Sequence, residues 1–343
     1  DHRDLHYPLR RQRQMCIRDS IESLTFENTA IGNALLDALA RGVGVKVLLE
    51  GAPATGIADQ ERYICQQLER SGAECWFMIR DDERHVHDRY RYLHSKFLVI
   101  DGSRAVISSE NLSPSSLPND DKADGTWGRR GLVLITGSPV VVQRLLDIFN
   151  DDLDEARHQD LFRWQGGHPV YGGPPEGYVP ITVTGGTTYT VRYPQPVTLH
   201  DVNSIGLFQA PENMLRRSDG LLALLQMAGP GDIVRVQQLT EREHWGTASS
   251  DPIQDPNPRI EAYIDAARRG ATVRIMLDAY FDRSDEPLSN ASTCAYVLQV
   301  AAAEGLRMRC VLTNPTGLGI HNKMVLLQLG DQGWIHIGSW NGT

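Results

Sequence analysis

Two short segments of the sequence carry the same polar side chains at the same spacing. In the first, His94 and Lys96 stand two positions apart, and Ser109 and Asn111 follow after a short apolar run. The second segment has the same residue types: His321, Lys323, Ser339 and Asn341. An imidazole can attack phosphorus or transfer a proton, and ammonium and carboxamide groups donate hydrogen bonds to phosphoryl oxygens. This pattern indicates chemistry on a phosphodiester.

A predicted hairpin brings the members of the first cluster together. The dipeptide Asp101-Gly102 is typical of a two-residue hairpin turn. A turn at this point pairs Ile100 with Ser103 and places Ser109 opposite His94. Because alternate residues of a strand share a face, we expect all four side chains of the cluster on one side of the hairpin. The second cluster repeats this arrangement on a hairpin that is three residues longer.

Two such clusters supply both roles that cleavage of a phosphodiester requires. One histidine attacks phosphorus and forms a phosphohistidine, while the other protonates the leaving alkoxide and then activates water. No metal ligands and no cofactor are expected. The predicted catalytic residues are His94, His321, Lys96 and Lys323. The predicted phosphate-binding residues are Asn111, Asn341, Ser109 and Ser339.

The clusters close two copies of a longer repeat. Ile31–Gly51 and Ile260–Ala279 each contain an amphipathic helix, a glycine turn and an apolar strand, and each is followed by a second helix and strand. The turn glycines, Gly42 and Gly270, are 228 residues apart, and the motif histidines are 227 apart. A spacing this constant indicates an internal duplication. We therefore predict an α/β fold of two pseudo-symmetric halves, each a mainly parallel sheet flanked by helices.

These motifs resemble those of the phospholipase D superfamily, which includes cardiolipin synthases. The family signature is His-x-Lys, four residues and Asp, followed by Gly-Ser-x-Asn. Here it reads His94-Ser95-Lys96 to Asp101 with Ser108–Asn111, and His321-Asn322-Lys323 with Gly338–Asn341. The resemblance extends from about Ile21 to the end of the chain. It implies a phospholipase D-like fold and metal-independent hydrolysis or transfer through a phosphohistidine, with His94 as nucleophile and His321 as general acid.

The sequence departs from the family pattern at three places. Gln328 stands where the second motif has Asp, and Ser108 replaces the first glycine of Gly-Ser-x-Asn. The family often has an acidic residue after the first motif to orient a catalytic histidine, but Trp127–Gly131 contains none. Three nearby carboxylates remain as alternatives for that role: Asp120, Asp121 and Asp124.

The charge of the chain bears on its substrate. It has 34 Lys and Arg against 43 Asp and Glu, a net charge of −9, and no basic stripe interleaved with aromatic residues. Such a balance disfavours nucleic acid. We expect a phospholipid or another small phosphodiester, with peripheral contact at a membrane surface and no transmembrane segment. The alternatives are a nuclease of the same superfamily and a non-catalytic phosphate-binding module. The oligomeric state is left open.

The repeat also predicts the division of the chain. Residues 1–20 are interpreted as a disordered or foreign tail, and residues 21–163 as the first repeat. Residues 164–200 form a Gly- and Pro-rich connection with a hairpin near its end. Residues 201–343 form the second repeat, which we expect to be truncated, so that the chain is a fragment.

Four cysteines occupy equivalent elements of the two repeats. Cys65 and Cys75 lie in the second helix and following strand of the first copy, and Cys294 and Cys310 lie in those of the second. Each pair is level if the helix packs antiparallel to its strand, so we expect disulfides Cys65–Cys75 and Cys294–Cys310. Four buried thiols are the alternative. Disulfides would favour a secreted or periplasmic protein over a cytoplasmic one.

Overall fold

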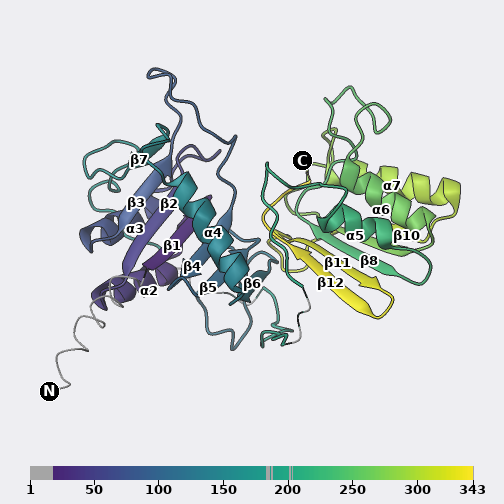
Figure 1. Cartoon of the computed structure of the whole chain (residues 1–343), viewed down its shortest axis with the longest axis horizontal. Coiled ribbons are helices and arrows are strands. Elements are labelled where there is room, and N and C mark those ends of the chain that lie inside the picture. The colour runs from purple at the N-terminus through teal and green to yellow at the C-terminus, as the bar shows by residue number, and fades with distance from the viewer. Residues whose placement is uncertain (1–17, 183–185, 187, 201, 203, 343) are drawn as a thin grey trace. The chain divides into compact units, whose positions relative to one another are not determined.

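The structure is a computed structural model that describes residues 18–182, 186, 188–200, 202 and 204–342 (Figure 1). The chain divides into two compact units. The first comprises the chain up to Asp121 and Val133–Gly185, and the second comprises Lys122–Leu132 and Gly186–Thr343. No helix in the described part of the chain is long and apolar enough to cross a bilayer.

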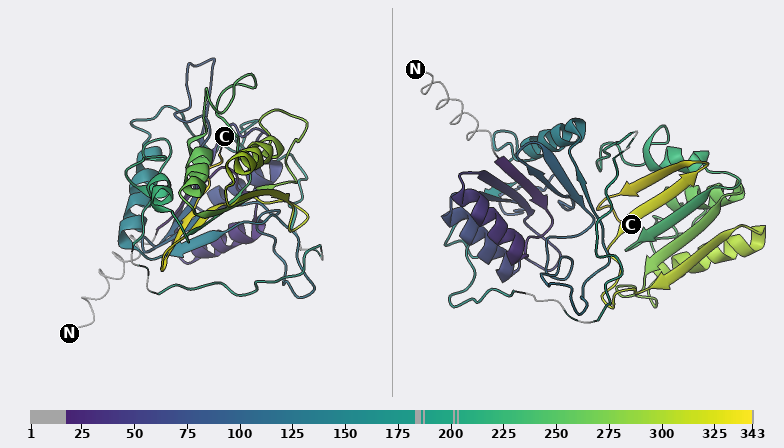
Figure 2. Two further views of the ribbon diagram at one scale, coloured as in Figure 1. Left: turned by 90° about the vertical axis from the view of Figure 1, so that its right-hand side faces the viewer. Right: turned by 90° about the horizontal axis from the view of Figure 1, so that it is seen from below.

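The first unit is built on a seven-stranded sheet with the order β6-β5-β4-β1-β2-β3-β7. Its strands are β1 (Arg18–Ser23), β2 (Gly44–Glu50), β3 (Glu74–Met78), β4 (Lys96–Ile100), β5 (Arg104–Ser108), β6 (Val133–Thr136) and β7 (Leu161–Arg163). Its helices are α2 (Thr29–Ala40), α3 (Asp59–Arg70) and α4 (Pro139–Asp152). Figure 2 shows α4 on one face of this sheet and α2 with α3 on the other.

The second unit has a five-stranded sheet with the order β10-β9-β8-β11-β12. Its strands are β8 (Ile233–Gln238), β9 (Thr272–Asp278), β10 (Met308–Thr313), β11 (Lys323–Leu329) and β12 (Gln332–Ile337). Its helices are α5 (Gly220–Met227), α6 (Pro258–Arg268) and α7 (Asn290–Glu304). Each unit encloses an apolar core of its own between sheet and helices.

The two units confirm the predicted α/β fold with two pseudo-symmetric halves. In each, three neighbouring strands run parallel, as βα connections require, and the His-x-Lys strand joins them antiparallel. Each sheet is therefore mixed, and the prediction of mainly parallel sheets is wrong. The antiparallel hairpin that carries the motif, together with β6 and β7 in the first unit, accounts for the difference.

Matching helix signals explain why the same elements form twice. The side chains of Asn28 and Asn257 accept backbone N–H groups at the starts of α2 and α6. After each helix, Gly42 and Gly270 adopt positive φ angles of 87° and 101°, which glycine tolerates best. The glycines that indicate the repeat in the sequence thus mark the ends of equivalent helices in the structure.

The repeat boundaries differ from the predicted ones in places. Strand β1 begins at Arg18, inside the segment interpreted as a tail, and residues 1–17 lie outside the described residues. The hairpin predicted near the end of the connection falls partly on residues 183–185 and 187, which also lie outside them. A described residue of that segment, Tyr189, pairs instead with Thr126.

The turn of the first hairpin forms as predicted, but its ladder is shifted by one residue. Asp101 and Gly102 have φ angles of 52° and 58°, and the N–H of Ser103 donates to the carbonyl of Ile100 at 3.0 Å. The ladder then pairs Ile100 with Arg104, because Ser103 is accommodated as an extra residue. The predicted register is therefore wrong.

The corrected register puts a different residue beside each motif lysine. Continuing the ladder by its last pair places Ser108 opposite Lys96, so Ser109 is not opposite His94. In the second unit the turn at Gly330-Asp331 joins Leu329 to Gln332, and Gly338 donates its N–H to the carbonyl of Lys323. The first residue of the Ser/Gly-Ser-x-Asn motif thus lies next to the lysine in both copies.

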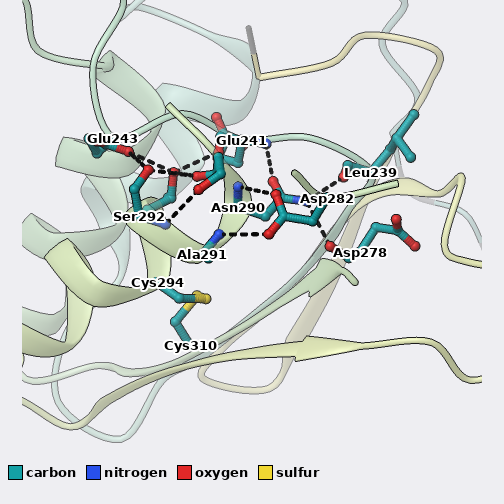
Figure 3. The surroundings of a disulfide bond; sticks show 12 residues. Leu239, Glu241, Glu243, Asp278, Asp282, Asn290, Ala291, Ser292, Cys294 and Cys310 are labelled. Atoms are coloured by element: carbon teal, nitrogen blue, oxygen red, sulfur yellow. Dashed lines mark hydrogen bonds between the residues drawn. A yellow bond between two sulfur atoms is a disulfide. The ribbon is translucent and has the colours of Figure 1, made fainter. Parts of the chain in front are cut away.

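One of the two predicted disulfides is present. Cys294 of α7 is bonded to Cys310 of β10, with 5.1 Å between their Cα atoms (Figure 3). The equivalent pair in the first unit, Cys65 and Cys75, consists of buried thiols, so that bridge is absent. The Cys75 thiol instead contacts the carbonyl of Cys65, with 3.9 Å from sulfur to oxygen, inside the apolar core. Cys16 lies outside the described residues.

The disulfide gives a test of how the second unit is stabilised. The bond closes a loop with a sequence separation of 16. A cross-link of this size restricts the unfolded chain, so its removal should lower the free energy of unfolding by about 3 kcal/mol. We expect dithiothreitol to lower the urea midpoint of the native chain. The double variant Cys294→Ala, Cys310→Ala should be less stable and insensitive to the reductant. Equal midpoints with and without reductant in the native chain would contradict a stabilising role.

Candidate active site

In the first unit the motif lysine is bound to the backbone of its own histidine. Lys96 is the first residue of β4, and His94 lies two positions before it. The ammonium of Lys96 donates to the carbonyl of His94 at 2.8 Å, and the lysine is only 3% exposed. A buried positive charge is therefore fixed beside the histidine.

The second unit repeats this contact. The ammonium of Lys323 donates to the carbonyl of His321 at 2.7 Å. It also lies 3.2 Å from Nδ1 and 3.4 Å from Nε2 of the same imidazole. Both residues are almost fully buried, at 6% for His321 and 3% for Lys323. An anion placed against this imidazole would meet the ammonium as well, which suits a phosphoryl group.

The side chain of the middle residue of each motif contacts a side chain on the adjacent strand of its sheet, which runs antiparallel to the motif strand. In the first unit the hydroxyl of Ser95 donates to the carboxyl group of Glu22 on β1. In the second, the amide of Asn322 donates to the side-chain oxygen of Gln237 on β8 at 2.6 Å. Glu22 pairs with Phe97 one strand over, and Gln237 pairs with Met324, so the two contacts are equivalent. Because alternate residues of a strand face opposite ways, this contact turns the histidine and lysine to the other side.

A buried carboxylate holds the residue before each histidine. Glu50 ends β2 and accepts the N–H of Leu93 at 2.6 Å. Asp278 ends β9 and accepts the N–H of Ile320. Burial raises the pKa of both carboxyl groups, and the backbone hydrogen bonds that each accepts oppose the rise. Neither residue was predicted, although an acidic residue closing an apolar strand in both repeats was a usable signal.

The two motif asparagines occupy equivalent positions after the hairpins. Leu112, next to Asn111, forms a parallel bridge with Phe26, and Gly342, next to Asn341, forms one with Glu241. The Oδ1 atoms of both asparagines are buried and make no hydrogen bond within the described part of the chain. Buried polar atoms are rarely left unpaired, so these two amides fit a ligand-binding role.

The motif serines behave differently from the asparagines. The hydroxyl of Ser109 donates to the neighbouring Glu110 at 3.0 Å, and Ser108 accepts the N–H of Glu110. Ser339 follows β12 and is half-buried. With the corrected register, the serines do not lie on the face of the hairpin that was predicted to contain the histidines.

The segment after the first motif reaches the second histidine. Lys122–Leu132 belongs to the second unit, where the N–H of His321 donates to the carbonyl of Arg130 at 2.9 Å. Of the three carboxylates considered for orienting a histidine, Asp121 and Asp124 are exposed and Asp120 is half-buried. Among the described residues, no group of three or more His, Cys, Asp or Glu side chains is placed to bind a metal ion.

Titratable groups in the first unit stand where the second unit has amides. Burial, followed by the nearby Asp152 carboxylate, raises the pKa of Glu22 to about 8, against which the hydrogen bond from Ser95 acts. Burial likewise raises the pKa of Glu61, which accepts the N–H of Phe26, to about 8. The equivalent of Glu61 is Asn290, whose Oδ1 accepts the N–H of Glu241 at 3.0 Å (Figure 3). Near neutral pH a protonated carboxyl group therefore does in one unit what an amide does in the other.

Comparisons with known proteins find a family model that matches the first part of the chain and solved structures with a similar fold. Residues 18–153 match the family described as cardiolipin synthase, PLD-like domain. Phosphatidylserine synthase from Haemophilus influenzae Rd KW20 has a similar fold, with a TM-score of 0.53 and 12% identity over 93% of this chain and 74% of that one. No curated protein sequence matches the chain.

Two further solved structures are similar at lower scores. Nuc from Salmonella typhimurium, described as a phospholipase D family member, has a TM-score of 0.33 and 15% identity over 46% of this chain and 90% of that one. Polyphosphate kinase from Porphyromonas gingivalis has a TM-score of 0.46 and 11% identity over 98% of this chain and 44% of that one.

The carboxyl groups of the first unit predict a dependence of stability on pH. Between about pH 4.5, the ordinary pKa of glutamate, and about pH 8, Glu22 ionises in the unfolded chain but not in the folded one. The free energy of unfolding should therefore fall as the pH rises through this window, by on the order of 5 kcal/mol for a carboxyl so shifted, and level off above it. Glu22→Gln should flatten the profile, measured as urea midpoints from pH 4 to 9.

Two further variants make this measurement specific. Glu61→Gln should flatten the profile as well, because the pKa of Glu61 is raised to the same value by burial. Glu83→Gln changes an exposed carboxylate and should leave the slope unaltered. A Glu22→Gln profile as steep as that of the native chain would show that this carboxyl group is not the one that titrates.

Proposed function

We propose that the chain, of which residues 18–153 match a phospholipase D-like domain family, cleaves phosphodiesters through its two His-x-Lys motifs. The observation that carries the proposal is the repeated contact of a buried lysine with the carbonyl of its motif histidine. The unpaired amide oxygens of Asn111 and Asn341 support it, since both clusters contain a buried polar group available to a ligand.

The proposed reaction has two steps. An imidazole nitrogen of His94 attacks phosphorus, the bond from phosphorus to the leaving oxygen breaks, and His321 gives its proton to that oxygen. His321 then takes a proton from water, the resulting hydroxide attacks phosphorus, and the phosphorus–nitrogen bond breaks to restore His94. An alcohol in place of water gives transphosphatidylation. The ammonium groups of Lys96 and Lys323 stabilise the charge that develops on the phosphoryl oxygens.

A phospholipid or another small phosphodiester is the proposed substrate. The net charge of −9 supports this choice over nucleic acid, which binds proteins chiefly through positive charge. The description of the matching family, which names cardiolipin synthase, favours a lipid further. Substrate in a bilayer would be reached by peripheral contact. The Cys294–Cys310 disulfide supports a secreted or periplasmic location.

One assay separates this proposal from its alternatives. The full chain is incubated in EDTA with phosphatidylglycerol vesicles, phosphatidylcholine vesicles and single-stranded DNA. Headgroup release from either lipid is the expected result. Cleavage of the DNA without headgroup release would instead identify a nuclease. No product from any of the three would leave a phosphate-binding module and overturn the enzymatic proposal.

The two histidines should each be indispensable. His94→Ala and His321→Ala are expected to reduce headgroup release to background, because the attack and the proton transfers need one imidazole each. EDTA should have no effect, and the pH profile of kcat/KM should be bell-shaped. His200→Ala, at an exposed position, is the matched control and should retain full activity. Phosphate trapped on His321 in an acid-quenched reaction would reverse the assignment of nucleophile and acid.

The motif lysines should contribute mainly to the transition state. Lys96→Met and Lys323→Met keep most of the side-chain volume but remove the charge that stabilises the phosphoryl oxygens. We expect each to lower kcat/KM by at least about 30-fold, which corresponds to about 2 kcal/mol. Urea midpoints measured in parallel separate lost catalysis from lost folding. A lysine variant that folds and keeps native kcat/KM would refute this role for its ammonium group.

A further inference from the structure

Two adjacent arginines lie beside the second histidine. Arg129 and Arg130 belong to Lys122–Leu132, which pairs with the second unit at two points. Thr126 and Tyr189 exchange backbone hydrogen bonds of 2.9 Å. Arg130 donates its N–H to Gly319 and accepts that of His321, both at 2.9 Å. The arginine segment is therefore attached directly to the backbone of the motif histidine.

The side chain of Arg129 lies on the side of His321. Arg130 is bridged in parallel to Ile320, so alternation puts Arg129 on the same side as Gly319 and His321. A ring contact agrees with this placement. The guanidinium of Arg129 lies 4.8 Å from the ring centroid of Phe281, and a Cβ added to Gly319 would lie 3.2 Å from an atom of that same ring.

The guanidinium of Arg130 contacts two aromatic side chains. Arg130 donates to the hydroxyl of Tyr189 at 2.6 Å and lies 5.0 Å from the centroid of that ring. Its guanidinium is also 6.0 Å from the ring centroid of Tyr193. Contacts of this kind fix the direction of a guanidinium while leaving most of its five N–H donors unused.

Neither arginine is neutralised by a carboxylate in the described part of the chain, unlike two other arginines of the protein. Arg259 of the second unit is paired with Glu241 at 3.0 Å, and Arg89 of the first is paired with Asp152 and Asp160. Arg129 and Arg130, by contrast, are half-buried and form no ion pair with any described residue. The guanidinium of Arg129, on the side of His321, thus retains its charge for a partner from outside, whereas alternation turns the side chain of Arg130 to the opposite side.

We propose that Arg129 forms an anion-binding subsite that recognises a second phosphate group on the substrate, a few bonds from the diester at His321. This inference rests on the proposed function, because the diester must be at the motif histidine for the second group to reach Arg129. Guanidinium groups bind phosphate oxygens through paired hydrogen bonds, which a single ammonium cannot provide. The subsite selects substrates with two phosphates over those with one.

Kinetics with matched substrates test this selection. Two p-nitrophenyl phosphodiesters share their leaving group, but one has choline as its alcohol and the other has glycerol 3-phosphate. The variant Arg129→Gln should lose tenfold or more in kcat/KM on the glycerol phosphate diester and less than twofold on the choline diester. Arg309→Gln, at an exposed site on β10, should change neither. An equal change on both substrates, or none, would overturn the subsite.

A binding measurement tests the subsite without turnover. Calorimetry with the full chain should show that inorganic pyrophosphate binds Arg129→Gln at least tenfold more weakly than it binds the native chain, while the affinity for inorganic phosphate changes less than threefold. Arg129→Lys preserves the charge and should retain part of the pyrophosphate affinity. Equal pyrophosphate binding by the native chain and the folded Arg129→Gln variant would refute the subsite. A chain that binds pyrophosphate through Arg129 but cleaves no diester would refute only the proposed function.

Discussion

In each unit a buried carboxylate at the end of the middle parallel strand accepts the peptide N–H that precedes the motif histidine. Glu50 does this in the first unit and Asp278 in the second. Since each carboxylate belongs to the sheet, the sheet itself determines where the histidine segment begins. Each also accepts a second N–H, from Ala52 or Phe281, and so joins two loops at one point. The contact between lysine and histidine carbonyl recurs in both units because an equivalent carboxylate fixes the residue before the histidine in each.

The duplication has preserved hydrogen bonds more strictly than residue types. A side-chain oxygen on the neighbouring strand accepts from the middle motif residue in both units, but it belongs to Glu22 in one and Gln237 in the other. The same exchange of carboxyl for amide separates Glu61 from Asn290. A protonated carboxyl group presents an acceptor much like that of an amide, so either residue satisfies the geometry. Only the first unit acquires a dependence on pH from this exchange.

The sequence was sufficient to predict two α/β units, because the repeat glycines mark the ends of equivalent helices and the parallel strands are apolar. It could not reveal that Ser103 is an extra residue after the Asp101-Gly102 turn, since the turn chemistry is satisfied either way. Glu50 and Asp278 were not predicted because an acidic strand end has many ordinary explanations. Level placement of helix and strand brought both cysteine pairs into equivalent positions, but it does not determine whether thiols are oxidised, and only Cys294–Cys310 is bonded.

The assignment of Lys122–Leu132 to the second unit makes the chain pass from one unit to the other and back before the connection that follows Gly185. The sequence repeats and the structural units therefore do not have the same boundaries. Separating the protein by a single cut between residues 164 and 200 would leave Gly319 and His321 without the backbone hydrogen-bond partner that Arg130 supplies. A fragment that ended between residues 164 and 200 would include a segment that pairs with the second unit, so a single cut does not yield two complete units.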